Sequence, residues 1–194
     1  MREDMSDFLI HFTKGEDLES AYQNLKSIID QSVVHGSSTK IRDGSNCVCF
    51  SEAPLSSLRS GLLNPSFYSP YSPFGIITIK EHIYKLDGRP VIYQPESEFH
   101  LLSPDNSWRH MRYEPPSVDF TWEREWRLKT DGYHFHPENT QIIVPDNSWT
   151  QRLIGEHDAE QQWQTLQYSQ IMDELLAIQY EEPFSWVILE LYNT

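Results

Sequence analysis

The sequence predicts an α+β fold in a single domain. Short apolar or β-branched runs recur along the chain, which is typical of strands. Two longer stretches instead place apolar residues at helical spacing. The chain has 194 residues, of which 38% are hydrophobic and 13% aromatic, so it can bury one sizeable core and is too short for three domains.

The first two elements are a strand over residues 8–12 and a helix over residues 17–31. The strand reads Phe-Leu-Ile-His-Phe and ends in a polar corner. In that corner Thr13 precedes Glu16 by three residues, which fits a capping box at the start of the helix. The helix is amphipathic, and its apolar positions are Leu18, Ala21, Tyr22, Leu25, Ile28 and Ile29.

Three more strands are predicted in the middle of the chain, over residues 47–51, 74–79 and 90–93. Residues 54–63 are expected to form a short helix. An aromatic and proline-rich loop follows over residues 64–73, and its length favours a functional or mobile segment. Residues 96–118 are irregular and mixed in composition.

Residues 121–129 carry the most informative pattern, because polar and apolar side chains alternate as in a strand. Glu123, Glu125 and Arg127 share one face of this predicted strand. A carboxylate in a partly dry cleft can offset the positive charge of an oxocarbenium-like sugar, as when a nicotinamide–ribose bond breaks. The alternative is a surface ladder in which these side chains and Arg124 pair across strands.

The last third predicts a strand over residues 141–144, a helix from Glu156 to about Tyr180, and a buried closing strand over residues 185–191. The apolar side of this helix would be Trp163, Leu166, Tyr168, Ile171, Leu175 and Ile178. We therefore expect residues 1–150 to form the core of the domain and residues 151–194 to add an acidic helix and the closing strand.

The charge is strongly acidic and unevenly placed. The chain has 29 acidic and 15 basic residues, for a net charge of −14. Residues 1–130 hold 18 acidic and 14 basic side chains, whereas residues 131–194 hold 11 acidic ones and a single basic one, Arg152. A nucleic-acid partner is therefore mildly disfavoured, and the acidic last third offers a surface to a basic protein partner.

Several classes of protein and of site are disfavoured. The longest uncharged run, residues 60–79, is broken by prolines, and the charged N-terminus lacks a signal-peptide core, so we expect a cytoplasmic protein without a membrane span. Cys47 and Cys49 have no second pair for zinc, and the scattered glycines build no phosphate-binding loop. His134 and His136 are strand-spaced, but the sequence positions no third metal ligand beside them, so no metal is expected.

Five short motifs follow one another along the chain. Two of them are distinctive, Cys-Phe-Ser-Glu-Ala-Pro-Leu at 49–55 and Glu-Arg-Glu-Trp-Arg at 123–127. The other three are His11-x-Thr13, residues 24–28 and residues 75–80. In this order, over residues 8–145, the motifs resemble the bacterial abortive-infection AbiGi-like group. More distantly they resemble ADP-ribosyltransferase-fold proteins such as the DarT-like DNA-modifying toxins and the RNA 2′-phosphotransferases.

The resemblance implies a split, mostly antiparallel sheet with flanking helices, and NAD as the substrate. Glu125 matches the glutamate that binds the nicotinamide-ribose hydroxyl and stabilises the transition state. Glu123 would orient the acceptor or take its proton. The implied cofactor-binding residues are His11, Thr13, Ser51, Tyr68 and Tyr71.

The chain also departs from this pattern. Phe74 stands in the strand where the toxin branch has a tyrosine, and the arginine of the DNA-modifying branch has two candidates, Arg42 and Arg59. The acceptor therefore stays open, and so does the activity of the site.

The leading hypothesis is a mono-ADP-ribosyltransferase-like enzyme of phage defence or of a toxin–antitoxin system, which transfers ADP-ribose to an unknown macromolecule. Hydrolysis of NAD by water is a close variant. The alternative is a catalytically silent binding or antitoxin module of the same fold. A third reading, transfer of an RNA 2′-phosphate, needs an Arg and His cluster that the sequence does not show locally.

Overall fold

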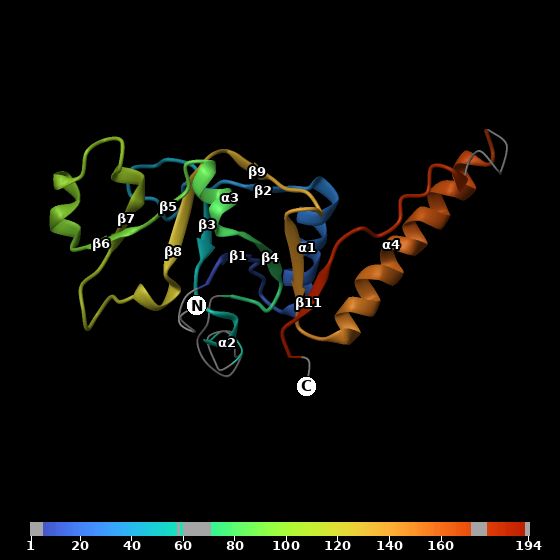
Figure 1. The fold of residues 1–194 in the computed structure, drawn as a ribbon, viewed down its shortest axis with the longest axis horizontal. Helices are drawn as coiled ribbons and strands as arrows, with labels where there is room; N and C mark the ends of the chain where they lie inside the picture. The colour runs from blue at the N-terminus through green and yellow to red at the C-terminus, as the bar shows by residue number, and fades with distance from the viewer. Residues whose placement is uncertain (1–5, 58, 60–70, 172–177, 193–194) are drawn as a thin grey trace.

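The structure is a computed structural model, which describes residues 6–57, 59, 71–171 and 178–192. Within these residues one seven-stranded sheet runs in the order β11-β10-β4-β1-β3-β8-β5, and helices pack around it (Figure 1). Its strands are β1 (Phe8–Phe12), β3 (Cys47–Ser51), β4 (Gly75–Ile79), β5 (Arg89–Pro90), β8 (Glu125–Lys129), β10 (Thr140–Val144) and β11 (Ile188–Glu190).

The sheet is mostly antiparallel. Every neighbouring pair within it is antiparallel except β10 and β11, which run parallel. The prediction of an α+β fold with a mostly antiparallel sheet is therefore confirmed.

The two faces of the sheet bury different side chains because successive strand residues point to opposite sides. Leu9, Ile76 and Ile142 belong to the larger apolar cluster, and their neighbours Ile10, Ile77 and Ile143 belong to a second one. Helix α1 (Leu18–Gln31) covers the first face. Its buried side chains are Ala21, Tyr22, Leu25 and Ile29.

The start of α1 differs from the expected capping box. Asp17 is the N-cap, and its carboxylate accepts a hydrogen bond from the backbone N–H of Ser20 at 2.7 Å, while the Ser20 hydroxyl bonds back to the Asp17 N–H. The Thr13 hydroxyl is used elsewhere: it lies within hydrogen-bond distance of the backbone oxygens of Ala21 and Phe74. The prediction that Thr13 and Glu16 cap the helix was therefore wrong.

Two small sheets and several short helices complete the core. Strands β2 (Val33–His35) and β9 (Gly132–His134) are antiparallel, whereas β6 (Ile92–Gln94) and β7 (His110–Arg112) are parallel. The expected strand over residues 90–93 is divided between β5 and β6 at Val91. The short helices are α2 (Leu55–Ser57), α3 (Lys80–Lys85) and the 3₁₀ turns Glu96–Leu101, Ser107–Arg109 and Thr121–Glu123.

The strand expected over residues 121–129 begins only at Glu125. Residues Thr121–Glu123 form a 3₁₀ turn, and Arg124 adopts a left-handed conformation with φ of 45°. A left-handed residue is not extended, so Arg124 ends the strand pattern on its N-terminal side. Non-glycine residues rarely adopt this conformation. The alternation holds from Glu125 to Lys129, where Glu125, Arg127 and Leu128 are buried.

The C-terminal helix also differs from its prediction. Helix α4 (Asn147–Tyr168) begins nine residues before the expected Glu156, because Asp146 caps it by accepting from the N–H of Ser148 at 2.9 Å. It ends at Tyr168, well before the expected Tyr180. Its expected apolar side is not buried: Trp163 and Leu166 are 60% and 54% exposed. Leu175 lies outside the described residues.

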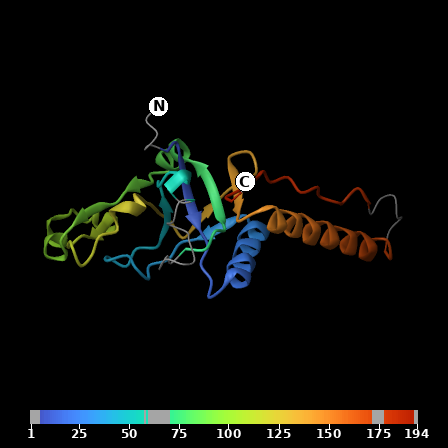
Figure 2. The ribbon, with the colours of Figure 1, turned by 90° about the horizontal axis from the view of Figure 1, so that it is seen from below.

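The closing strand is shorter and less buried than expected. Strand β11 covers only Ile188–Glu190, at the edge of the sheet, and its three residues are half-buried. Figures 1 and 2 show α4 extending away from the sheet, with the chain that leads to β11 alongside it.

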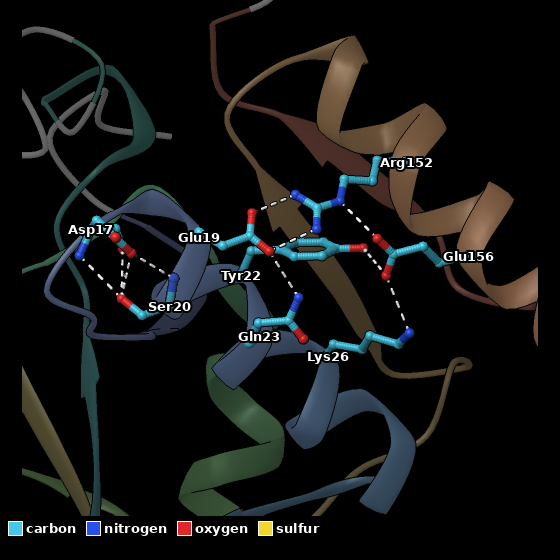
Figure 3. Close-up of polar contacts among 8 residues, drawn as sticks. All are labelled: Asp17, Glu19, Ser20, Tyr22, Gln23, Lys26, Arg152 and Glu156. Atoms are coloured by element: carbon cyan, nitrogen blue, oxygen red, sulfur yellow. Dashed lines mark hydrogen bonds and ion pairs between the residues drawn. The ribbon is translucent and has the colours of Figure 1, made fainter.

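A polar cluster fixes the base of α4 to α1 (Figure 3). The Arg152 guanidinium forms ion pairs with Glu19 and Glu156, and it lies over the rings of Tyr22 and Trp149 at 4.4 and 5.2 Å from their centroids. Lys26 joins the cluster through Glu156 and Glu160.

In the part of the chain described, no helix has the length and apolar character to cross a membrane.

Candidate functional site

A pocket opens where β1, β3 and β8 lie side by side. Its cavity of about 220 Å³ is at the small end for ligand sites, so it would enclose part of a larger ligand. It brings together five of the predicted site residues, His11, Ser51, Tyr71, Glu123 and Glu125. Further lining comes from apolar side chains such as Ile41, Met111 and Phe120, and from Lys14, Lys40, Cys49 and Arg127.

The two most specific sequence pieces form neighbouring strands at this pocket. Strands β3 and β8 pair antiparallel, with Ser51 opposite Glu125 and Cys49 opposite Arg127. These four residues line the pocket, while Trp126 and Leu128 on the other face pack into the larger apolar cluster. The pieces also bond to each other, because the Trp126 indole donates to the Glu52 carboxylate at 2.6 Å.

Glu125 is buried and paired with a buried arginine. The Nε of Arg127 donates to Oε1 of Glu125 at 2.8 Å, and its Nη1 donates to the backbone oxygens of Trp108 and His110 at 2.7 and 2.8 Å. Cys49 lies beside Glu125 in the pocket, and burial and the charge of Glu125 raise the pKa of the Cys49 thiol. Glu125 and Arg127 therefore do not form the surface ladder considered for them: they pair within one strand, and both are buried.

Glu123 reaches the same pocket from the 3₁₀ turn before β8. The Ser51 hydroxyl donates to the Glu123 backbone oxygen at 2.7 Å, which holds the turn against β3. The Tyr71 hydroxyl donates to Oε2 of Glu123 at 2.9 Å. Burial raises the pKa of Glu123 above its ordinary value and the charge of Glu125 adds to this, while the Tyr71 hydrogen bond opposes it.

His11 is held as a neutral ring. Burial lowers its pKa, and nearby Lys14 acts in the same direction. Its Nδ1 lies 2.8 Å from the backbone oxygen of Cys49, so Nδ1 carries the proton and Nε2 is left as an acceptor. On the other side of β1, Gly75 allows β4 to approach closely, because a Cβ there would lie 2.3 Å from the His11 backbone oxygen.

Of the other predicted residues, those that the structure describes do not line the pocket. Thr13 is buried, and its hydroxyl faces the backbone oxygens already described. Tyr68 lies outside the described residues. Arg42 forms an ion pair with Glu96 away from the pocket, and Arg59 is exposed.

The histidine pair is also outside the pocket. His134 and His136 are exposed and do not line it with Glu125. Across the described ranges, no group of three or more His, Cys, Asp or Glu side chains is arranged to hold a metal ion.

Sequence reasoning missed four polar residues of the pocket. Arg127 and Cys49 share strand faces with Glu125 and Ser51, so the alternation carried their signal. Lys14 and Lys40 are far apart in sequence, and nothing local links them. Both lie near enough to Glu123 to lower its pKa, and the Lys14 ammonium lies 5.5 Å from the centroid of the Tyr71 ring.

Comparison with known proteins finds no match to this chain among family models, curated proteins or solved structures. The observations therefore define it as a mixed α+β protein with a large, mostly antiparallel sheet and a polar pocket at the β1, β3 and β8 strands.

Proposed function

We propose that this protein is an ADP-ribosyltransferase-like enzyme that cleaves the nicotinamide–ribose bond of NAD. It would transfer ADP-ribose to a macromolecule, in phage defence or a toxin–antitoxin system. One observation carries the proposal: residues assigned to NAD from four distant parts of the sequence, His11, Ser51, Tyr71 and the Glu123/Glu125 pair, line one pocket. If these short motifs resembled the family only by chance, there would be no reason for their residues to line the same pocket.

Glu125 supplies the charge that this reaction needs. As the C1′–N bond breaks, its electron pair goes to the nicotinamide nitrogen, and positive charge develops on the ribose ring. A carboxylate in a dry pocket stabilises that charge strongly because little water screens it. The ion pair with Arg127 fixes the orientation of the carboxylate in advance.

Glu123 completes the transfer as the general base. The acceptor oxygen or nitrogen forms the new bond to C1′, and its proton passes to the Glu123 carboxylate. A raised pKa suits this role, because a base works best when its pKa lies near the working pH. When water takes the place of the acceptor, the same steps release free ADP-ribose.

The remaining pocket residues bind the substrate. The free Nε2 of His11 accepts a hydrogen bond from a ribose hydroxyl. The Tyr71 ring offers a stacking face to nicotinamide. The ammonium groups of Lys14 and Lys40 attract the negative charge of the dinucleotide.

One observation favours a second candidate, a silent binding or antitoxin module that keeps this fold. Oε1 of Glu125 already accepts from Arg127, so part of the carboxylate is committed to a structural ion pair. In that case the pocket would bind a ligand without turnover.

The direct test is nicotinamide release from NAD, with DNA, RNA and protein offered as acceptors. We expect release by the wild type, and losses of about 10²–10³-fold for Glu125→Gln and about 10²–10⁴-fold for Glu123→Gln. Glu138→Gln, at an exposed glutamate outside the pocket, is the matched control and should keep full activity. Circular dichroism must show that each variant folds. Absence of both nicotinamide release and NAD affinity in the wild type would overturn the proposal.

A further inference from the structure

The outer part of α4 and the segment that returns beside it form an arm, defined as residues 157–171 and 178–187. The return segment, residues 178–187, is hydrogen-bonded to one side of the helix. His157 contacts the Glu182 backbone oxygen at 2.8 Å, the Gln161 side chain accepts from the Glu182 N–H at 2.9 Å, and Thr165 donates to Glu181 at 2.9 Å. Figures 1 and 2 both show the arm projecting from the sheet.

The covered side of the helix is polar, and the uncovered side is apolar. His157, Gln161 and Thr165 are spaced four residues apart and make one stripe, and these three are the half-buried positions between 157 and 168. Ala159, Trp163 and Leu166 follow an i, i+4, i+7 spacing, which places them on the opposite side. All three are exposed, Trp163 by 60% and Leu166 by 54%.

Exposed apolar residues continue along the described part of the arm. Ile171, Ile178, Tyr180 and Val187 are 79%, 47%, 62% and 55% exposed. Single exposed apolar residues are ordinary on protein surfaces, but an apolar stripe at helical spacing on a projecting helix indicates a site for another surface.

The acidic charge near this apolar stripe indicates which kind of partner surface can bind to it. After Arg152 the sequence has eight acidic side chains and no Lys or Arg. On the helix, Asp158 and Glu160 are exposed on either side of the stripe, whereas Glu181 and Glu182 lie on the return segment against the polar side. A second copy of the arm would bring like charges together, and an anionic lipid surface would be repelled.

We propose that the arm is the docking site for a basic, amphipathic helix of a partner protein. Apolar side chains of the partner helix would pack on Ala159, Trp163 and Leu166, while its Lys and Arg residues would face Asp158 and Glu160. This proposal is independent of the pocket and of its activity.

The test measures binding of a fluorescently labelled, amphipathic Leu/Lys helical peptide to the full chain by anisotropy. We expect binding that weakens with added salt, and that falls about tenfold or more in the double variant Trp163→Ala/Leu166→Ala. Leu101→Ala, which removes another exposed apolar side chain outside the arm, is the matched control and should bind like the wild type. A peptide with Glu in place of every Lys should bind at least about tenfold more weakly.

Three outcomes would overturn the proposal. The first is no binding of the Leu/Lys peptide, or binding that the double variant leaves unchanged. The second is self-association of the wild type in sedimentation that the double variant abolishes, since the arm would then pair with a second copy. The third is Trp163-dependent binding to phosphatidylglycerol vesicles, which would assign the stripe to a membrane surface. Nicotinamide release by the double variant reports separately on the pocket and should equal that of the wild type.

Discussion

At the scale of single residues, the two carboxylates of the pocket have different surroundings. Glu125 is held by the guanidinium of Arg127, whereas Glu123 is held by the neutral hydroxyl of Tyr71. Burial favours a proton on Glu123, whereas the Glu125 carboxylate lies against the positive charge of Arg127. This difference is what a reaction with one electrostatic carboxylate and one general base requires.

Replacing Tyr71 by Phe should move the pH dependence of NAD cleavage. The Tyr71 hydrogen bond lowers the pKa of Glu123, so its loss raises that pKa further, and the rate should begin to rise only at higher pH. The measurement is the pH profile of kcat/KM. Tyr84→Phe, at an exposed tyrosine, should leave the profile in place. A Tyr71→Phe profile that coincides with the wild type would exclude Glu123 as the base.

Replacing Arg127 by Met should destabilise the fold by about 3–5 kcal/mol, because it leaves the buried Glu125 carboxylate without its partner. Urea unfolding measures this loss. The double variant Glu125→Gln/Arg127→Met should lose less than the sum of the two single changes, since neither charge is then left alone. Strict additivity would show that the two side chains do not act as a pair.

At the scale of elements, the short strands and the bounds of α1 were predictable, whereas the ends of α4 were not. Strands β1, β3, β4 and β10 follow local apolar patterns that the sequence shows directly. Helix α4 was misplaced because its apolar residues are exposed on the arm, while its start depends on the Asp146 cap. The sequence analysis assigned the cap of α1 to Thr13, but the Thr13 hydroxyl lies against the backbone oxygens of Ala21 and Phe74, and Asp17 caps the helix instead.

The junction between α1 and α4 should depend on Arg152. Its two aromatic contacts are worth about 0.5–1 kcal/mol each at a partly exposed site, so Arg152→Met should lower the thermal midpoint by a few degrees. Arg152→Lys should not restore the midpoint, because Lys lacks the flat guanidinium that spans Glu19 and Glu156. Calorimetry measures both. Arg112→Met, at an exposed pair with Glu114, should leave the midpoint nearly unchanged.

At the scale of the whole molecule, the fold explains why the candidate site was partly predictable. Glu123, Glu125 and Ser51 lie in the two contiguous motifs that are most specific to the resemblance. Lys14 and Lys40 could not be joined to them from sequence, because only the folded sheet brings these segments together. The net charge also divides by place, with a nearly balanced first 130 residues that contain the pocket and an acidic last third that includes the arm.

The free energy of unfolding should depend on pH because the pKa of Glu123 is raised in the folded protein. In the folded protein this group keeps its proton above the ordinary pKa of 4.5, so its contribution to stability is present below that pH and is lost as the pH rises through the folded pKa. Glu123→Gln removes this loss. The variant should therefore gain stability relative to the wild type in urea unfolding as the pH rises above 4.5. A constant difference over this range would mean that Glu123 ionises as freely when folded as when unfolded.

The central claim is that the pocket beside β1, β3 and β8 binds NAD. Its most direct test is a titration with a carbocyclic NAD analogue, which cannot be cleaved, followed through the histidine ring resonances in NMR. We expect the His11 resonances to shift and saturate, while the resonances of the exposed His134 and His136 stay in place. An unmoved His11 at saturating analogue, or no saturable binding, would contradict it.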